Sequence, residues 1–429
     1  MFITIFAVVL MIVLLLGIPV VFSLGFTSIF VIAIERGIAD IPFAAIAQRL
    51  IYGINNFPIL AIPCFLLAGK LMNEAGVTVR IFRFANSLVG HLPGGLGHAN
   101  VVASVIFSGM SGSAIGDIVA MGPIEIKAMK EAGFPHKFSV AITAASSLIG
   151  PIIPPSIPMV FYGVLAGVSI GSLFIGGIIP GLLMAVSLMV WVYVKAKRHN
   201  YPQGELSLAE MWESFKEAFV PLGTPVILIG GIWVGVFTPT EAAAAAVVYV
   251  VVMGIGNRSL TLARFIPILR ETVRETAILL FILACGSLYG WMMVRLRVPY
   301  VLLDLFISTI SSPMMVIIIL VLFFLFMGCF LSVVVIINIT VPIITPILAQ
   351  YGIDPLYFGV IAIVTLMIGV LTPPFGNVLF ALTLISGLSF EDVVKAILPP
   401  IIPILVVVVL LILFPPLITF LPKLALGMR

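Results

Sequence analysis

The stretch from Ile149 to Ser156, IGPIIPPS, places three prolines and a glycine in an apolar part of the chain, where a continuous membrane helix would be expected. A proline has no N–H to bond the carbonyl four residues earlier, so Pro154 and Pro155 leave the carbonyls of Gly150 and Pro151 without helical partners. In hydrocarbon an unsatisfied carbonyl costs several kcal/mol. The stretch therefore predicts a discontinuous helix. A simple kink, with hydroxyls or water meeting the carbonyls, is the alternative.

The composition identifies the class of protein. Of 429 residues, 62% are hydrophobic and only 9% are charged, as in integral membrane proteins. The apolar runs do not alternate with polar residues, which excludes an outer-membrane barrel and predicts an all-α polytopic membrane protein. The N-terminal run has no basic region or cleavage site, so we expect it to be retained as a first membrane segment. Runs long enough to cross a bilayer include Ile3 to Ile34, Leu173 to Val194, Val220 to Phe237 and Leu398 to Leu421.

The sequence lacks the residues that several activities require. Cys64, Cys285 and Cys329 stand alone in apolar segments, which favours buried packing over disulfide or metal roles. There is no P-loop and no HExxH motif, and neither an acid/base pair nor a metal cluster supports a membrane enzyme. The small net charge of +4 comes from short loops and implies no nucleic-acid partner. Transport against a gradient would therefore need an ion gradient or a partner.

The two halves of the chain resemble each other at a constant offset of 219 residues. Matched glycines and prolines carry the most weight, because apolar identities are common by chance in such a composition. We predict a first repeat over 1–195, a polar connector over 196–222 and a second repeat over 223–429, as in many transporters. The offset pairs Phe107 with Phe326, Gly109 with Gly328, Ser113 with Ser332, Pro123 with Pro342, Gly133 with Gly352, Gly150 with Gly369, and Pro154 and Pro155 with Pro373 and Pro374.

The connector carries an amphipathic pattern from Ser207 to Phe219, with apolar residues at helical spacing against glutamates. A helix lying at the membrane surface and a solvated linker helix both fit this pattern.

Each repeat contains a candidate re-entrant hairpin. In the first, SGMSGS interrupts the segment from Ser104 to Asp117 and places Gly109, Ser111 and Ser113 at a tip. The counterpart runs from Leu325 to Asn338, and we predict hairpins over about 94–130 and 314–349. A small-residue face for helix packing is the alternative.

Each repeat also contains a candidate broken helix, over about 138–168 and 356–386. The second break is IGVLTPPFGN, Ile368 to Asn377. Unwound carbonyls joined by a hydroxyl of Ser146 or Ser147, and of Thr365 or Thr372, would form a hard oxygen cage suited to Na⁺. The half-helix beyond each proline pair would offer free N–H groups to an anion.

Each of two acidic residues has two possible roles, one structural and one functional. Glu241 lies three residues after Thr238 in TPTEAAAAAV. This spacing favours a helix capping box over an ion or proton site as the role of Glu241. Asp117 follows the first tip and suits either a structural or a functional role.

Five stretches together resemble the large membrane subunit of tripartite ATP-independent periplasmic (TRAP) transporters, over nearly the whole chain: SGSAIGD, MGPIEIKAMKEAGFP, IGPIIPPS, GVFTPTEAAAAAV and GVLTPPFGN. The resemblance implies a Na⁺-driven importer of organic acid anions in the bacterial inner membrane. It implies two partners besides membrane lipid: a small four-helix membrane subunit and a periplasmic substrate-binding protein. It also implies an elevator, in which a domain built around two hairpins moves against a scaffold. The hairpin tips then fall within Ser104 to Asp117 and within Gly328 to Ser332.

The predicted sites follow from the breaks and this resemblance. The substrate site is rich in hydroxyls and has no arginine in either break, which favours a hydroxylated monocarboxylate such as sialic acid over a C4-dicarboxylate. An ion channel that uses the broken helices as a filter is the alternative function. The predicted substrate residues are Ser111, Ser113, Ser156, Ser332 and Asn377. The predicted ligands of two or more Na⁺ ions are Ser104, Ser108, Gly109, Ser146, Ile149, Gly150 and Pro151 in the first repeat, and Gly328, Gly369, Thr372 and Phe375 in the second.

Overall fold

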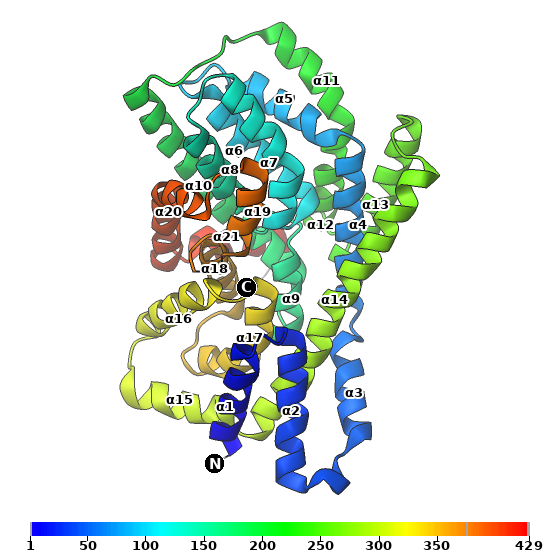
Figure 1. The fold of residues 1–429 in the computed structure, drawn as a ribbon, viewed down its shortest axis with the longest axis vertical. Helices are drawn as coiled ribbons and strands as arrows, with labels where there is room; N and C mark the ends of the chain where they lie inside the picture. The colour runs from blue at the N-terminus through cyan, green and yellow to red at the C-terminus, as the bar shows by residue number, and fades with distance from the viewer. Residues whose placement is uncertain (1, 375, 427–429) are drawn as a thin grey trace.

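The computed structural model describes residues 2–374 and 376–426, and over those residues the chain forms helices and turns with no strand. Seven helical segments are long and apolar enough to cross a membrane. The all-α polytopic class is therefore confirmed. Figure 1 shows the helices, which in the first half of the chain are α1 (Phe2–Leu15), α2 (Val20–Arg36), α3 (Phe43–Ile54), α4 (Ala61–Glu74), α5 (Val77–Val89), α6 (Gly95–Ser111), α7 (Ala114–Glu131), α8 (His136–Ser147), α9 (Ile157–Ala166) and α10 (Ile170–His199).

The second half begins with the connector helix α11 (Leu208–Pro225), which continues through the π-helical turn η3 (Val226–Gly230) into α12 (Gly231–Trp233). Two short 3₁₀ turns, η1 (Ile38–Asp40) and η2 (Phe57–Leu60), lie between helices of the first half. The remaining helices are α13 (Pro239–Gly256), α14 (Leu262–Arg295), α15 (Val298–Thr309), α16 (Pro313–Gly328), α17 (Val333–Gln350), α18 (Pro355–Val370), α19 (Asn377–Ser386), α20 (Phe390–Leu413) and α21 (Pro416–Leu426).

Two of the long apolar runs are divided in the structure. The run from Ile3 to Ile34 is interrupted between α1 and α2, where Gly17 has a φ of +76° and Pro19 precedes the new helix. The run from Leu398 to Leu421 is interrupted at Phe414, where the helix ends before the consecutive prolines that follow. Hydrophobicity alone does not show these breaks, because they depend on backbone conformation and on missing N–H groups.

The helices of the second half follow the order of those in the first. In the first half, the chain forms a hairpin pair (α6 and α7), then a broken pair (α8 and α9), and then α10. In the second half, the same order is formed by α16 and α17, then α18 and α19, and then α20. The halves also interlock, since α9 packs against α17 and α19 packs against α7, as Figure 1 shows.

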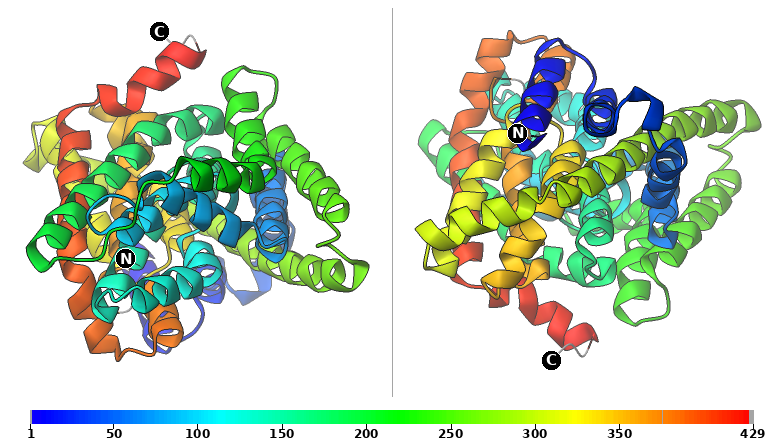
Figure 2. Two further views of the ribbon diagram at one scale, coloured as in Figure 1. Left: turned by 90° about the horizontal axis from the view of Figure 1, so that it is seen from above. Right: turned by 90° about the horizontal axis from the view of Figure 1, so that it is seen from below.

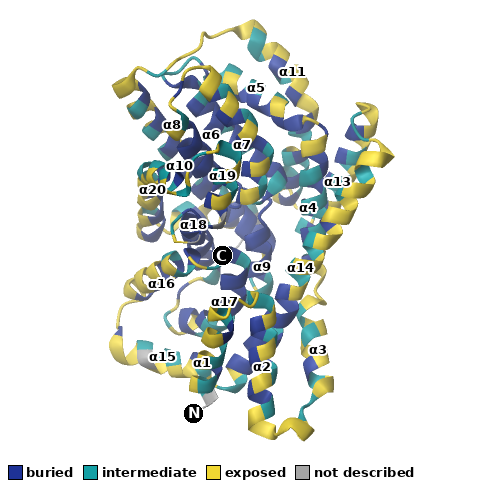
Figure 3. Ribbon diagram, in the orientation of Figure 1, coloured by how far each residue is buried: buried dark blue, intermediate teal, exposed yellow. Residues whose placement is uncertain are grey.

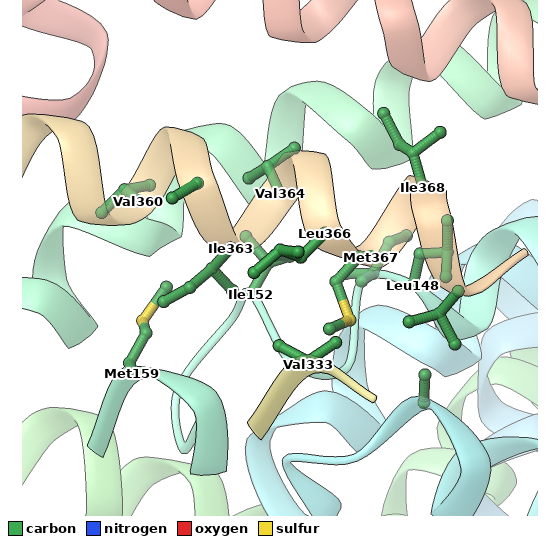
Figure 4. Packing of buried hydrophobic residues seen from close by; sticks show 14 of the residues in the cluster. Leu148, Ile152, Met159, Val333, Val360, Ile363, Val364, Leu366, Met367 and Ile368 are labelled. Carbon is green, nitrogen blue, oxygen red and sulfur yellow. The ribbon is translucent and has the colours of Figure 1, made fainter. Parts of the chain in front are cut away.

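The two halves share one core. Figure 4 shows Leu148 and Ile152 of the first break facing α18, where Ile363, Leu366 and Ile368 are buried. In Figure 3 the buried residues gather around this region, whereas α1, α3, α13 and α15 carry many exposed residues. The first break is thus held between helices of both halves.

The connector helix is clamped to α5. Arg83 Nε donates to Glu210 Oε1 at 2.7 Å, and its Nη1 donates to Glu217 Oε1 at 2.7 Å. The Ser87 and Ser214 hydroxyls lie 2.8 Å apart. Arg83 therefore joins α11 to the helix that leads into the first hairpin.

Helices α13 and α14 form an arm that extends to one side of the molecule, as the two views in Figure 2 show. Thr238 Oγ1 accepts from the Glu241 N–H, and Glu241 Oε2 accepts from the Thr238 N–H at 2.8 Å. Glu241 therefore caps the N-terminus of α13, as its spacing predicted.

Candidate functional site

The first hairpin turns at Gly112, between α6 and α7. Gly112 has a φ of +63°, which a residue without Cβ adopts at little cost. Ser113 then caps α7 by accepting from the Gly116 N–H at 3.3 Å. The Ser111 hydroxyl donates to Asp117 Oδ1, so the tip is closed by a side chain of its own second helix.

The first tip rests on the first break. A Cβ atom placed on Gly112 would lie 2.6 Å from the Pro155 carbonyl oxygen. The Asp117 carboxyl group lies against Gly150, since a Cβ there would come within 3.0 Å of Asp117 Cγ. Asp117 is 2% exposed, and no group in the described residues hydrogen-bonds its Oδ2 atom. A buried carboxylate oxygen therefore faces the broken backbone.

The second tip rests on the second break in the same manner. Residues 329–332 join α16 to α17, and Ser332 precedes α17 without a capping hydrogen bond from its side chain. A Cβ atom placed on Gly328 would lie 2.9 Å from the Cα of Gly369. Only glycine at both positions allows the two backbones this contact.

The first break leaves part of its backbone unpaired. The Pro151 carbonyl accepts from the Ser156 hydroxyl, whereas no hydrogen bond from the described chain reaches the Gly150 carbonyl. The Ile149 carbonyl accepts from the N–H groups of Ile152 and Ile153 at 2.9 and 3.0 Å. Of the two carbonyls expected to be orphaned, only that of Gly150 is open.

The second break shows a related pattern. The Gly369 carbonyl accepts from the Thr372 N–H at 2.8 Å, and the Val370 carbonyl has no hydrogen-bond donor among the described residues. Thr372 Oγ1 donates to the Ile368 carbonyl at 2.8 Å, so its lone pairs stay available. The peptide bonds Pro154–Pro155 and Pro373–Pro374 are both cis.

A cavity of about 670 Å³ lies between the two tips, the first break, the end of α18 and helix α14 of the arm. Ser111 and Ser113 line it from the first tip, and Ser332 lines it from the second. Pro151 and the first residues of α9, Ile157 and Pro158, line it from the first break. The structure therefore brings three of the five predicted substrate residues to one cavity.

The other predicted substrate residues are placed differently. Ser156 is fully buried and caps α9, where its Oγ accepts from the Met159 N–H at 3.2 Å, and it does not line the cavity. Asn377 begins α19, while its side chain and the whole of Phe375 lie outside the described residues.

The predicted cation ligands of the first hairpin are buried. Ser108 Oγ donates to the Val105 carbonyl, and Ser104 is 3% exposed on the same helix. Gly109 packs against Pro225, the last residue of α11, since a Cβ on the glycine would lie 2.7 Å from Pro225 Cβ. Ser146 stands in the last turn of α8, where its Oγ donates to Asn100 Oδ1 at 2.6 Å.

The cavity also contains charges that the motifs did not indicate. Lys70 of α4 lines it and lies 2.8 Å from Glu275 Oε1 and 3.2 Å from Glu271 Oε1, both on α14. Among the described lining residues Lys70 is the one positive side chain. The neighbouring Gly69 packs on the first tip, since its Cβ would lie 3.1 Å from the Met110 carbonyl oxygen. A lysine inside the apolar run from Ala61 to Met72 was the available sequence signal.

A second group missed from the sequence is a buried polar chain behind the first break. Asn100 Nδ2 donates to Glu125 Oε2 at 2.8 Å and to Thr143 Oγ1 at 2.7 Å. The same amide accepts from Ser146, so α6, α7 and α8 meet in one network. Its acidic member, Glu125, is 1% exposed.

The family model and the relatives matched by sequence agree on one family. The model of the tripartite ATP-independent periplasmic transporter DctM component matches residues 7–417. The chain is 44% identical to the sialic acid TRAP transporter large permease protein SiaM of Vibrio cholerae, over 96% of each protein. It is 39% identical to the sialic acid TRAP transporter permease protein SiaT of Haemophilus influenzae, over 96% of this chain and 67% of that one.

Other relatives are named for different substrates. The 2,3-diketo-L-gulonate large permease YiaN of Escherichia coli is 37% identical over 82% of this chain and 84% of that one. The C4-dicarboxylate large permease DctM of Rhodobacter capsulatus is 34% identical over 96% and 97%. In fold, the chain is similar to the YdaH transporter of Alcanivorax borkumensis, with a TM-score of 0.62 at 14% identity over 86% of this chain and 88% of that one.

Proposed function

Since this chain belongs to the DctM component family of TRAP transporters, the large permeases, we propose that it imports an organic acid anion with Na⁺, and that the anion is a sialic acid. Large permeases of this family are multi-pass proteins of the bacterial inner membrane and work with a small membrane subunit and a periplasmic binding protein. They are transporters, not enzymes. The substrate and the coupling ion are the parts proposed for this chain.

The cavity between the two hairpin tips is the observation that carries the proposal. It is lined by the hydroxyls of Ser111, Ser113 and Ser332, which suit the many hydroxyls of a sialic acid. Lys70 is placed to attract the carboxylate, although it must exchange its contacts with Glu271 and Glu275 to bind it. The similarity to two permeases named for sialic acid points the same way.

Na⁺ coupling is supported by oxygen atoms near both tips. The open carbonyls of Gly150 and Val370 and the unpaired Oδ2 of Asp117 are hard ligands of the kind Na⁺ prefers. When an anion enters, a cation at either break would also offset the negative charge of Glu271 and Glu275, the two carboxylates of the cavity. Substrate and Na⁺ would then bind together, and the hairpins with their broken helices would move as an elevator against a scaffold of α4 and the arm.

Uptake by the assembled system tests this function. The chain is reconstituted in proteoliposomes with its small membrane subunit, and its periplasmic binding protein is added outside. We expect uptake of labelled N-acetylneuraminate when Na⁺ is high outside, no uptake when choline replaces Na⁺, and no competition by excess succinate. Equal uptake in choline would exclude Na⁺ coupling. Preferential uptake of succinate would show that the substrate is a C4-dicarboxylate and not a sialic acid. Single-channel currents would favour the ion channel instead.

A further inference from the structure

Two carboxyl groups are buried in the first hairpin without a positive partner. Asp117 and Glu125 are 2% and 1% exposed, and in the described chain no lysine, arginine or histidine forms an ion pair with either. One oxygen of each, Asp117 Oδ2 and Glu125 Oε1, has no hydrogen-bond partner among the described residues. Burial of an uncompensated charge is expensive, so each group must either keep its proton or have a cation bound nearby.

The architecture does not require this polar cluster, as the second half of the chain shows. At the offset of 219, Asn100 corresponds to Ile319, Asp117 to Ile336, Glu125 to Ile344 and Thr143 to Ala362. There a hairpin packs against a broken helix with apolar side chains alone at these positions. Because apolar residues of similar size are usually at least as stabilising as buried charges, the polar cluster in the first half calls for a function.

The cluster reaches the first break from two sides. Asp117 lies against Gly150 inside the break. Glu125 reaches the end of α8 indirectly, because Asn100 donates to Glu125 Oε2 with its amide nitrogen and accepts from Ser146 with its amide oxygen. The residues of this hydrogen-bonded network are all at least 98% buried. Water therefore does not screen the charge of Glu125.

From this geometry we infer that Glu125, acting through Asn100 and Ser146, is a positioning residue that strengthens a monovalent cation site at the first break, and that the second break has no such support. The negative charge of Glu125 stabilises a cation near Gly150 electrostatically, and the amide of Asn100 fixes the orientation of the Ser146 hydroxyl. Second-sphere groups of this kind commonly change metal affinity by about 10- to 100-fold. The two breaks are therefore unequal cation sites. The inference rests on the proposed Na⁺ coupling.

Thermal unfolding of the purified complex with its small subunit tests the inference without any transport. The unfolding midpoint is followed as NaCl replaces choline chloride at constant ionic strength. We expect E125Q, which keeps the size of the side chain and removes its charge, to need about tenfold more Na⁺ for half of the stabilisation. E125D, which keeps the charge, should restore the wild-type requirement in large part. E131Q, which removes an exposed carboxylate from the same helix, should behave as the wild type.

The outcomes separate the two proposals. If Na⁺ stabilises the wild type and E125Q responds at the same Na⁺ concentration, Glu125 holds a proton and the inference is wrong, while Na⁺ coupling stands. If Na⁺ does not stabilise the wild type more than choline does, both proposals fail. Should E125Q aggregate, the N100L variant, which is similar in size, provides the measurement, because it removes the amide that joins Glu125 to Ser146. An unchanged Na⁺ requirement in N100L would then overturn the inference.

Discussion

Gly328 and Gly369 touch through their backbones: a Cβ atom placed on Gly369 would lie 2.6 Å from the Cα of Gly328. This contact seats the tip of the second hairpin on the end of α18, immediately before the second break. Under the proposed Na⁺ coupling, this contact sets the position of the hairpin that would close over the ion.

A methyl group at this contact should separate the tip from the break. We expect G369A to lower the free energy of unfolding by about 1–3 kcal/mol through overpacking and to reduce Na⁺-dependent uptake strongly. Uptake in proteoliposomes and the thermal midpoint measure the two effects. G256A is the matched control, because Gly256 lies in a helix with no atom within 4 Å of the added Cβ. Wild-type uptake by G369A would show that the contact has no role in transport.

Removal of the positive charge from the cavity should weaken substrate binding. We expect K70M to raise the half-saturating concentration of N-acetylneuraminate about tenfold, since a hydrogen bond to a charged group contributes about 1.5–3 kcal/mol. K70R should keep most of the affinity, and K127M, at an exposed lysine of α7, should not change it. Calorimetric titration of the purified complex supplies the affinities. An unaltered affinity in K70M would remove Lys70 from the site.

Ser156 and Ser332 should respond differently to truncation. Loss of the cap of α9 in S156A should cost about 1 kcal/mol of stability and leave sialic acid affinity unchanged. S332A should weaken sialic acid binding with little effect on stability, because this side chain lines the cavity and forms no cap. S207A, at the cap of α11, is the control for a stability effect alone. Weaker substrate binding in S156A would show that this residue contacts the substrate after all.

The hydroxyl of Thr372 should contribute to Na⁺ binding at the second break. T372V keeps the shape of the side chain, and we expect it to raise the Na⁺ concentration needed for half-maximal uptake severalfold. T383V is its control, because Thr383 makes the same kind of bond to the carbonyl four residues earlier, at 2.9 Å, outside the predicted site. An identical Na⁺ dependence in T372V and the wild type would exclude Thr372 as a ligand.

The sequence by itself determined the class of protein, its family and the two helix breaks at the paired prolines. These properties are local, because a proline lacks an N–H wherever it stands and a long apolar run belongs in a membrane. For the same reason α8 and α18 end ahead of their proline pairs, and Thr238 and Glu241 form the expected capping box.

Only the tertiary structure decided which side chains meet at the site. The sequence could not show that Ser156 points into the protein and caps α9. A serine at a helix start can cap the helix or contact a substrate. Lys70 enters the cavity because α4 packs against the first tip, and Asn100, Glu125 and Ser146 meet because three helices converge behind the first break. These contacts join residues distant in the chain, and their geometry is set by helix packing.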